Sequence, residues 1–291
     1  MTHIPATGAA SSPAPASAAA SPDMANSATP VLPRLSTAVT GDARGPGILL
    51  AHGATGSIEG NYAQLIPALT ASGHRVVAPD YPGSGRTPRA TAPLTLDSLA
   101  DALVAEADAA GLQTFTLVGF SLGTAVSVRA AVRHPDRVRG LVLTSALARP
   151  DRRLGVWLAL WLRLLAEGDY AGFAQVRALS GLSPEYLNGL SPAELEAVLD
   201  PSPDLPPPGS AEQAALVRTV DTTADLPQLA VPALVIATTR DQLLHPSLSR
   251  YVADHIPGAT YAEIATGHVP MVERPDEWLG LITDFLAAHR L

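Results

Sequence analysis

The hydrophobic positions of the chain form short apolar runs that alternate with helical patterns. Runs bounded by Gly, Pro or Asp predict strands near residues 35–40, 47–51, 75–79, 115–118, 138–143, 233–237 and 261–264. Between them, apolar residues recur at helical spacing over about 61–71, 96–110, 122–133, 246–255 and 275–289. This alternation predicts an α/β fold, in which a mostly parallel sheet carries helices on both faces.

The alternation is interrupted between residues 148 and 226. Helical patterns occur there at about 154–166, 170–179 and 192–199, followed by a Pro-rich segment, and no strand pattern appears. We expect a helical cap over 148–226, inserted into a core domain formed by residues 34–147 and 227–291. Residues 1–33 are rich in Ala, Ser and Pro, so we expect a disordered tail rather than a signal peptide.

Composition narrows the chemistry that the chain can use. Apolar residues make up 47% of the 291 residues, which suits a large core. The chain contains no Lys and no Cys, which excludes a thiolate nucleophile, a Schiff-base lysine and a disulfide. Its net charge of −8, without a basic stripe, argues against a nucleic-acid partner. The longest apolar run, near 156–165, is too short to cross a membrane. The absence of Cys fits the cytosol, so we expect a cytoplasmic protein, and we expect its partner to be a small molecule.

A candidate nucleophile lies between the strand predicted at 115–118 and the helix predicted at 122–133. The segment reads Gly119-Phe120-Ser121-Leu122-Gly123. A Gly-x-Ser-x-Gly motif between a strand and a helix is typical of a nucleophile elbow, a sharp turn that exposes a serine hydroxyl. Side chains at 119 and 123 would collide with neighbouring backbone, which explains both glycines. We therefore predict Ser121 as the nucleophile.

A serine nucleophile needs a base that is neutral near physiological pH, and histidine meets this requirement. The chain contains eight histidines. His52 lies in an early loop and His245 begins a helix, whereas His268 lies in the loop after the last predicted strand. An elbow serine is followed along the chain first by the acid and then by the histidine. This order favours His268 as the base.

The acid is expected at the end of a late strand, before the histidine. Asp241 follows the strand at 233–237 and could accept a hydrogen bond from the His268 imidazole. Asp151, which follows the strand at 138–143, remains an alternative, while Asp225 precedes the late strand. We predict Asp241 as the acid.

Two backbone amides and three aromatic side chains are candidates for contacting the substrate. The Leu122 amide follows the nucleophile, and the Ala54 amide lies in the loop after an early strand, so both are predicted to form an oxyanion hole. Phe120 adjoins the nucleophile. Trp157 and Trp161 are four residues apart and share a helix face. We predict that all three aromatic side chains line the substrate pocket, with packing inside the protein as the alternative.

Taken together, these motifs resemble the α/β-hydrolase superfamily. The resemblance covers about residues 35–291 and includes, besides the elbow, His52-Gly53-x-x-Gly56, Asp80–Thr87, His134–Val138 and Gly267–Pro275. Within the superfamily, the chain is similar to capped enol-lactonases, esterases and cofactor-free perhydrolases. The chain differs at Thr124, where a second glycine is common, and in its short N-terminal part, for which we expect an incomplete first hairpin.

The resemblance implies a Ser121–His268–Asp241 triad that works without a metal or an organic cofactor. The expected reaction is hydrolysis of an ester, lactone or thioester of a small to medium apolar substrate, through an acyl-enzyme intermediate. One alternative is the same triad used for acyl transfer, cyclisation, perhydrolysis or lyase chemistry. Another is a non-catalytic receptor for a small molecule. Three arginines that could bind a substrate carboxylate, or form a solvated basic face, are Arg149, Arg152 and Arg153.

Overall fold

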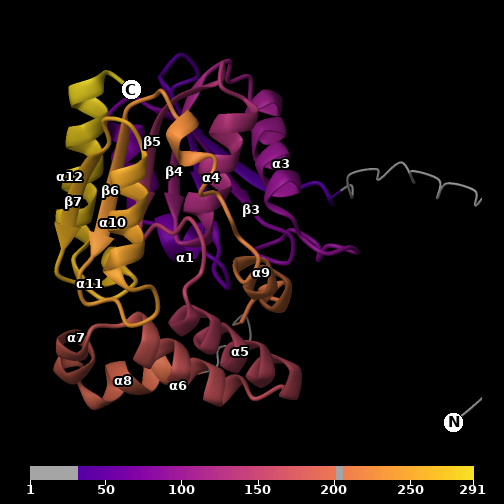
Figure 1. Ribbon diagram of the computed structural model, residues 1–291, viewed down its shortest axis with the longest axis vertical. Helices are drawn as coiled ribbons and strands as arrows, with labels where there is room; N and C mark the ends of the chain where they lie inside the picture. Colours follow the sequence, from indigo (N-terminus) through magenta and orange to yellow (C-terminus); the bar gives the residue numbers. More distant parts are fainter. Residues whose placement is uncertain (1–31, 201–205) are drawn as a thin grey trace, which may run out of the picture.

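Seven strands form one sheet in the computed structural model, which describes residues 32–200 and 206–291 (Figure 1). Their spatial order is β1-β3-β2-β4-β5-β6-β7, and only the pairing of β1 with β3 is antiparallel. This confirms the predicted α/β fold with a mostly parallel sheet. The strands are β1 (Ser36–Gly41), β2 (Gly47–Ala51), β3 (Arg75–Asp80), β4 (Phe115–Phe120), β5 (Val138–Thr144), β6 (Ala233–Thr238) and β7 (Thr260–Ile264).

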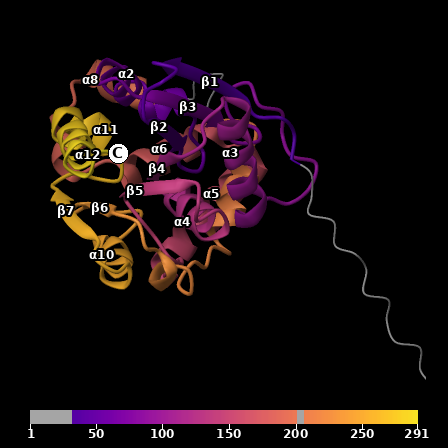
Figure 2. The same ribbon diagram turned by 90° about the horizontal axis from the view of Figure 1, so that it is seen from above.

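Helices cover both faces of the sheet, as the view from above shows (Figure 2). One face carries α1 (Ile58–Tyr62), α2 (Leu65–Ala71), α11 (Pro270–Glu273) and α12 (Pro275–His289). The other carries α3 (Leu96–Ala109), α4 (Leu122–Arg133) and α10 (Pro246–His255). The sequence of strand β2 is wholly apolar because both of its faces are covered by helices. Ile48 and Leu50 pack under the first group of helices, while Leu49 and Ala51 pack under the second.

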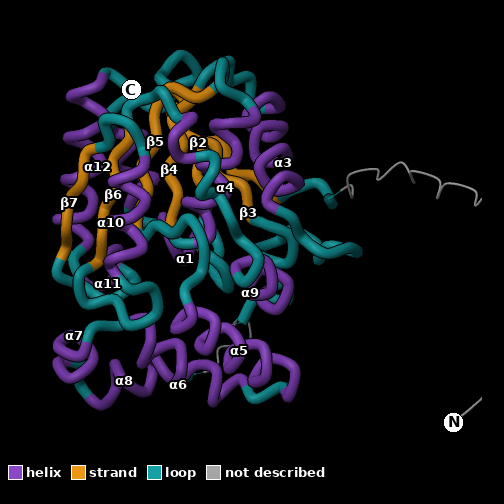
Figure 3. The backbone as a smooth tube through the Cα atoms, in the orientation of Figure 1, coloured by secondary structure: helices purple, strands orange, loops and turns teal. Residues whose placement is uncertain are grey.

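Between β5 and the short 3-10 helix η1 (Leu226–Gln228) that precedes β6, the described residues form five helices. They are α5 (Arg152–Glu167), α6 (Tyr170–Gly181), α7 (Pro184–Gly189), α8 (Pro192–Leu199) and α9 (Ser210–Val217). Figure 3 shows α5 to α8 beyond one end of the strands, with α9 between them and the sheet. They occupy the segment for which the sequence predicts a helical cap. Residues 1–31 of the predicted tail lie outside the described residues, as does part of the Pro-rich segment, residues 201–205.

Two local features differ from the sequence prediction. The helix predicted at 61–71 is divided into α1 and α2, because Pro67 has no N–H to donate to the Ala63 carbonyl one turn earlier. Helices α7 and α9 and the short α11 were not predicted. Ser183 caps the first turn of α7, and Pro184 occupies its first position, which is a helix-start signal that the sequence already contains. Within the described residues, the helices are too short or too polar to span a bilayer.

Candidate active site

The turn from β4 to α4 holds Ser121 in a strained backbone conformation. Its φ of 51° and ψ of −118° lie in a region that side-chain-bearing residues rarely adopt. A Cβ on Gly123 would overlap the Ala51 carbonyl oxygen, and a Cβ on Gly119 would lie 2.6 Å from the Gly123 carbonyl oxygen. The two glycines therefore allow β2, β4 and α4 to approach closely enough to hold the turn.

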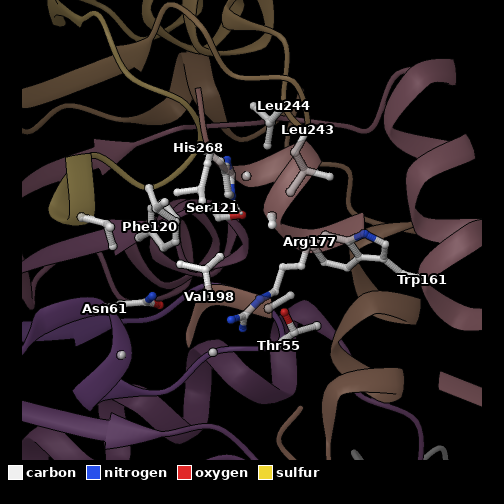
Figure 4. A pocket seen from close by; sticks show the side chains of 18 of the residues that line it. Thr55, Asn61, Phe120, Ser121, Trp161, Arg177, Val198, Leu243, Leu244 and His268 are labelled. Carbon is white, nitrogen blue, oxygen red and sulfur yellow. Dashed lines mark hydrogen bonds between the residues drawn. The ribbon is translucent and has the colours of Figure 1, made fainter. Parts of the chain in front are cut away.

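A continuous chain of hydrogen bonds joins Ser121 to His268 and Asp241 (Figure 4 shows the first two). The Ser121 Oγ lies 3.0 Å from His268 Nε2, and His268 Nδ1 lies 2.7 Å from Asp241 Oδ2. In the tautomer with the proton on Nδ1, the imidazole donates to the carboxylate and accepts from the serine hydroxyl. The three residues come from three different loops, yet their polar atoms form one buried line.

The Asp241 carboxylate is held by four donors. Its Oδ1 accepts hydrogen bonds from the Leu243 and Leu244 amides, at 2.9 and 2.7 Å. Its Oδ2 accepts from the Thr238 hydroxyl at 3.1 Å and from His268. Four hydrogen bonds to this buried carboxylate satisfy its oxygens and fix its orientation towards His268.

The alternative acids and bases lie elsewhere. Asp151 caps α5 by accepting from the Leu154 amide, and Asp225 is paired with Arg129. His245 caps α10 through its own side chain. None of these three side chains contacts Ser121 in the described structure.

His52 is committed to a structural role. Its Nε2 accepts from the Tyr81 amide at 2.9 Å, which leaves Nδ1 to donate to the Gly53 carbonyl at 2.8 Å. Burial lowers the pKa of His52 to about 4, so the ring is neutral at physiological pH. The imidazole therefore fixes the start of the loop that carries Ala54 and is not available as a second base.

The Ala54 and Leu122 amides have no hydrogen-bond partner among residues 32–200 and 206–291. The amides on either side of Ala54 are both occupied. Gly53 donates to the Asn61 side chain and Thr55 donates to Gln213, each at 2.9 Å. Ala54 thus carries an open amide between two occupied ones, and it lines the same cavity as Ser121. This arrangement suits two donors for an oxyanion.

Gln213 of α9 connects the cap segment to the loop that carries Ala54. Its side-chain oxygen accepts from the Thr55 amide, and its nitrogen donates to the Pro82 carbonyl at 3.2 Å and the Ser84 hydroxyl at 2.9 Å. The Gln213 side chain is completely buried. Thr55 has a φ of 60°, so this contact holds a strained residue next to the open amide. The sequence analysis missed Gln213 because it did not predict α9.

A cavity of about 390 Å³ lies between the sheet and the cap helices, with Ser121 and His268 in its wall (Figure 4). Phe120 and Trp161 both line this cavity, and the centroid of the Phe120 ring lies 4.9 Å from that of the His268 ring. Trp157 does not line the cavity, because its indole nitrogen donates instead to the Gln242 carbonyl at 3.0 Å. That hydrogen bond joins α5 to the loop after Asp241, which corresponds to the packing role given as the alternative for Trp157.

The arginine that reaches the cavity is not one of those singled out from the sequence. Arg149, Arg152 and Arg153 are absent from the described lining, and Arg153 donates to the Gln242 carbonyl. Arg177 of α6 lines the cavity instead. The part of the chain that the structure describes contains no cluster of three or more His, Asp or Glu side chains that could hold a metal ion.

Comparison with known proteins identifies the family of the chain. The family model described as the alpha/beta hydrolase fold matches residues 46–275. Pyrrolizixenacetamide deacetylase of Xenorhabdus hominickii is 35% identical over 250 residues, covering 85% of this chain and 93% of that protein. A pimeloyl-(acyl-carrier protein) methyl ester esterase of Neisseria meningitidis serogroup C is 28% identical, covering 82% of this chain and 93% of the esterase.

A solved structure of similar shape is the enol-lactonase from Burkholderia xenovorans LB400. Its TM-score to this chain is 0.78 at 25% sequence identity, and the match covers 87% of this chain and 96% of the enol-lactonase. The likeness therefore extends through the sheet and the cap segment alike.

Proposed function

Because the chain belongs to the α/β-hydrolase family, we propose that it hydrolyses a carboxylic ester, lactone or thioester through an acyl-enzyme intermediate on Ser121. The observation that carries this proposal is the hydrogen-bond chain from Ser121 through His268 to Asp241, which opens into a cavity with a mostly apolar wall. Small to medium apolar acyl groups fit a cavity of about 390 Å³.

In the proposed mechanism, His268 removes the Ser121 proton as the serine oxygen attacks the substrate carbonyl. The Ala54 and Leu122 amides stabilise the negative charge on the carbonyl oxygen, and Asp241 stabilises the imidazolium. His268 then donates its proton to the leaving group, which departs as an alcohol, enol or thiol. A water molecule, deprotonated by His268, then attacks the acyl-enzyme; the acid is released as His268 returns the proton to the Ser121 oxygen.

A second candidate is hydrolysis of an amide, which the name of the Xenorhabdus deacetylase favours. The same residues would act, but the amine leaving group must receive the His268 proton before the tetrahedral intermediate can expel it. A panel of matched p-nitrophenyl acetate and p-nitroacetanilide substrates distinguishes the two candidates by their relative kcat/KM.

A fluorophosphonate probe tests the proposal directly. We expect stoichiometric labelling of the folded protein at Ser121, located by peptide mass spectrometry, together with turnover of short p-nitrophenyl esters. Urea-denatured protein is the control and should not react, since the unfolded serine has no base. Absence of labelling in folded protein would contradict every triad mechanism. Labelling without ester turnover would instead favour the non-hydrolytic chemistries considered from the sequence.

Replacing Gln213 with Leu is expected to lower kcat for ester hydrolysis at least tenfold. The Thr55 amide, the Pro82 carbonyl and the Ser84 hydroxyl would lose a buried partner, and the loop that carries Ala54 would loosen. The free energy of unfolding should fall by about 2–4 kcal/mol. Steady-state kinetics and urea denaturation measure the two effects.

Gln228→Leu is a matched control, because the exposed Gln228 side chain donates to the nearby Ala224 carbonyl and lies outside the described cavity lining. We expect its kcat to equal that of the wild type and its stability to change by less than about 0.5 kcal/mol. A Gln213→Leu enzyme with unchanged kcat would show that this contact does not position the loop.

A further inference from the structure

Arg177 lies in the wall of the cavity that contains Ser121. It belongs to α6, and its side chain extends from the cap helices into the cavity, with the guanidinium towards Thr55 (Figure 4). Much of the surrounding wall is apolar, including Leu182, Val198 and Val217. A permanently charged group thus lies in surroundings that offer it little stabilisation.

No acidic side chain compensates Arg177 within the described residues. Burial alone lowers the pKa of the guanidinium, and no ion pair or hydrogen bond to it is formed there. By contrast, two arginines elsewhere form ion pairs: Arg129 with Asp97 and Asp225, and Arg133 with Asp97 and Asp101. A half-buried cation without a partner destabilises the folded protein, and an anion that enters the cavity would remove that cost.

The other polar groups of the wall do not neutralise the Arg177 charge. Asp200 also lines the cavity, but it is exposed and makes no ion pair with Arg177. The Trp161 indole N–H is buried without a hydrogen-bond partner among the described residues. Apart from His268, which is bonded to Ser121 and Asp241, Arg177 is the cationic side chain in the described lining. An anionic group in the cavity would therefore be attracted to Arg177.

We propose that the substrate carries a carboxylate, separate from the bond that is cleaved, and that Arg177 binds this carboxylate. The inference rests on the proposed hydrolase function and specifies its substrate class: monoesters or lactones of dicarboxylic acids, or esters of hydroxy acids. The planar guanidinium offers parallel N–H donors that match the two oxygens of a carboxylate. Binding there would hold the scissile carbonyl at a fixed distance from Ser121, so Arg177 acts as a specificity-determining residue.

Two matched substrate pairs test the proposal. Mono-p-nitrophenyl glutarate and p-nitrophenyl pentanoate differ by a carboxylate on the acyl side. The pair 4-acetoxybenzoate and methyl 4-acetoxybenzoate differs by a carboxylate on the leaving group. For each substrate, kcat/KM is compared between wild type and Arg177→Gln, so that intrinsic reactivity cancels. We expect a roughly 10- to 100-fold loss for the anionic member of at least one pair, and less than threefold for both neutral esters.

The control variant Arg163→Gln removes an exposed charge from α5, outside the cavity lining, and should leave all four values unchanged. Arg177→Lys should recover part of the selectivity, since it keeps the charge but not the paired donors. Equal losses for anionic and neutral esters in Arg177→Gln would overturn the proposal. No turnover of any ester by wild type would instead contradict the hydrolase function.

Asp200→Asn separates substrate binding from an internal role of Arg177. If Arg177 binds the substrate carboxylate, removing the Asp200 charge should leave the kcat/KM of anionic esters unchanged or raise it, because a carboxylate that competes for Arg177 is lost. If Asp200→Asn reproduced the Arg177→Gln losses on every substrate, Arg177 would be a partner of Asp200 and the proposal would be wrong.

Discussion

Replacing Ser121 with Ala is expected to lower kcat for ester hydrolysis roughly 10⁴- to 10⁶-fold. The remaining groups can still bind the ester and polarise its carbonyl through the Ala54 and Leu122 amides, so a residual rate above that in water should persist. The loss is larger than for any other single change discussed above, because no acyl-enzyme can form without the serine oxygen. Active-site titration with a p-nitrophenyl ester should show no burst of p-nitrophenol from the variant.

The Ser121→Ala variant should fold as the wild type does. Alanine has the same Cβ as serine, so the strained φ of 51° is neither relieved nor worsened. We expect the free energy of unfolding to differ by no more than about 1 kcal/mol. Equal stability with lost activity would assign the effect to chemistry rather than to folding.

Ser57 provides the comparison within the same cavity. It also lines the cavity wall, but its hydroxyl accepts from the Gly60 amide and caps α1. Ser57→Ala should cost about 1 kcal/mol of stability and keep most of the activity. Substantial hydrolysis and probe labelling in Ser121→Ala, lost again when Ser57 is also replaced, would transfer the nucleophile to Ser57.

The strands were predictable because each buried strand must be apolar on both faces. All positions of β2, β4 and β6 are buried, and their sequences are unbroken apolar runs apart from Gly and Thr. The edge strand β7 has one buried residue, Ile264, and its sequence pattern was correspondingly weak. The prediction of one short N-terminal strand is confirmed by β1, which pairs with β3 and has no hairpin partner in the described chain.

The candidate triad could be identified from sequence because its positions depend on backbone geometry. An elbow serine requires small neighbours, as the close approach of Gly123 to Ala51 illustrates, and chain order then selects the acid and the base. The cap residues have no such constraint. Residues four apart on a helix differ by about 40° in direction, enough for Trp161 to line the cavity while Trp157 contacts Gln242.

Arg177 could not be identified from the sequence although its helix was predicted, whereas Gln213 was missed together with its helix, α9. A helical pattern shows which face of a helix is apolar, but not which part of the sheet that face will cover. The environment of each side chain depends on how α6 and α9 are placed over the loops of the core. The cavity residues contributed by the cap segment, Arg177 among them, therefore lie where single-sequence prediction is weakest.

Replacing Asp241 with Asn is expected to lower kcat roughly 10³- to 10⁴-fold while the fold is retained. Steady-state kinetics over a pH series measure this loss of kcat. The Leu243 and Leu244 amides both donate to Oδ1, so an asparagine would keep its carbonyl oxygen there and turn its NH₂ group towards His268. That NH₂ group is a donor, so His268 Nδ1 would have to accept and Nε2 would carry the proton. The imidazole would then present a proton to Ser121 instead of a lone pair.

Asp151→Asn is the matched control, because Asp151 was the alternative acid in the sequence. Its carboxylate caps α5 through the Leu154 amide, and an asparagine caps a helix nearly as well. We expect kcat within about twofold of wild type. If instead Asp151→Asn lost activity and Asp241→Asn kept it, the acid would have to be reassigned. A neutral imidazole with its proton on Nε2 loses that proton only at very high pH, so raising the pH through the neutral range cannot restore the lone pair on Nε2. The loss of kcat in Asp241→Asn should therefore persist throughout the neutral range. A loss caused by a shifted pKa would instead be recovered at higher pH.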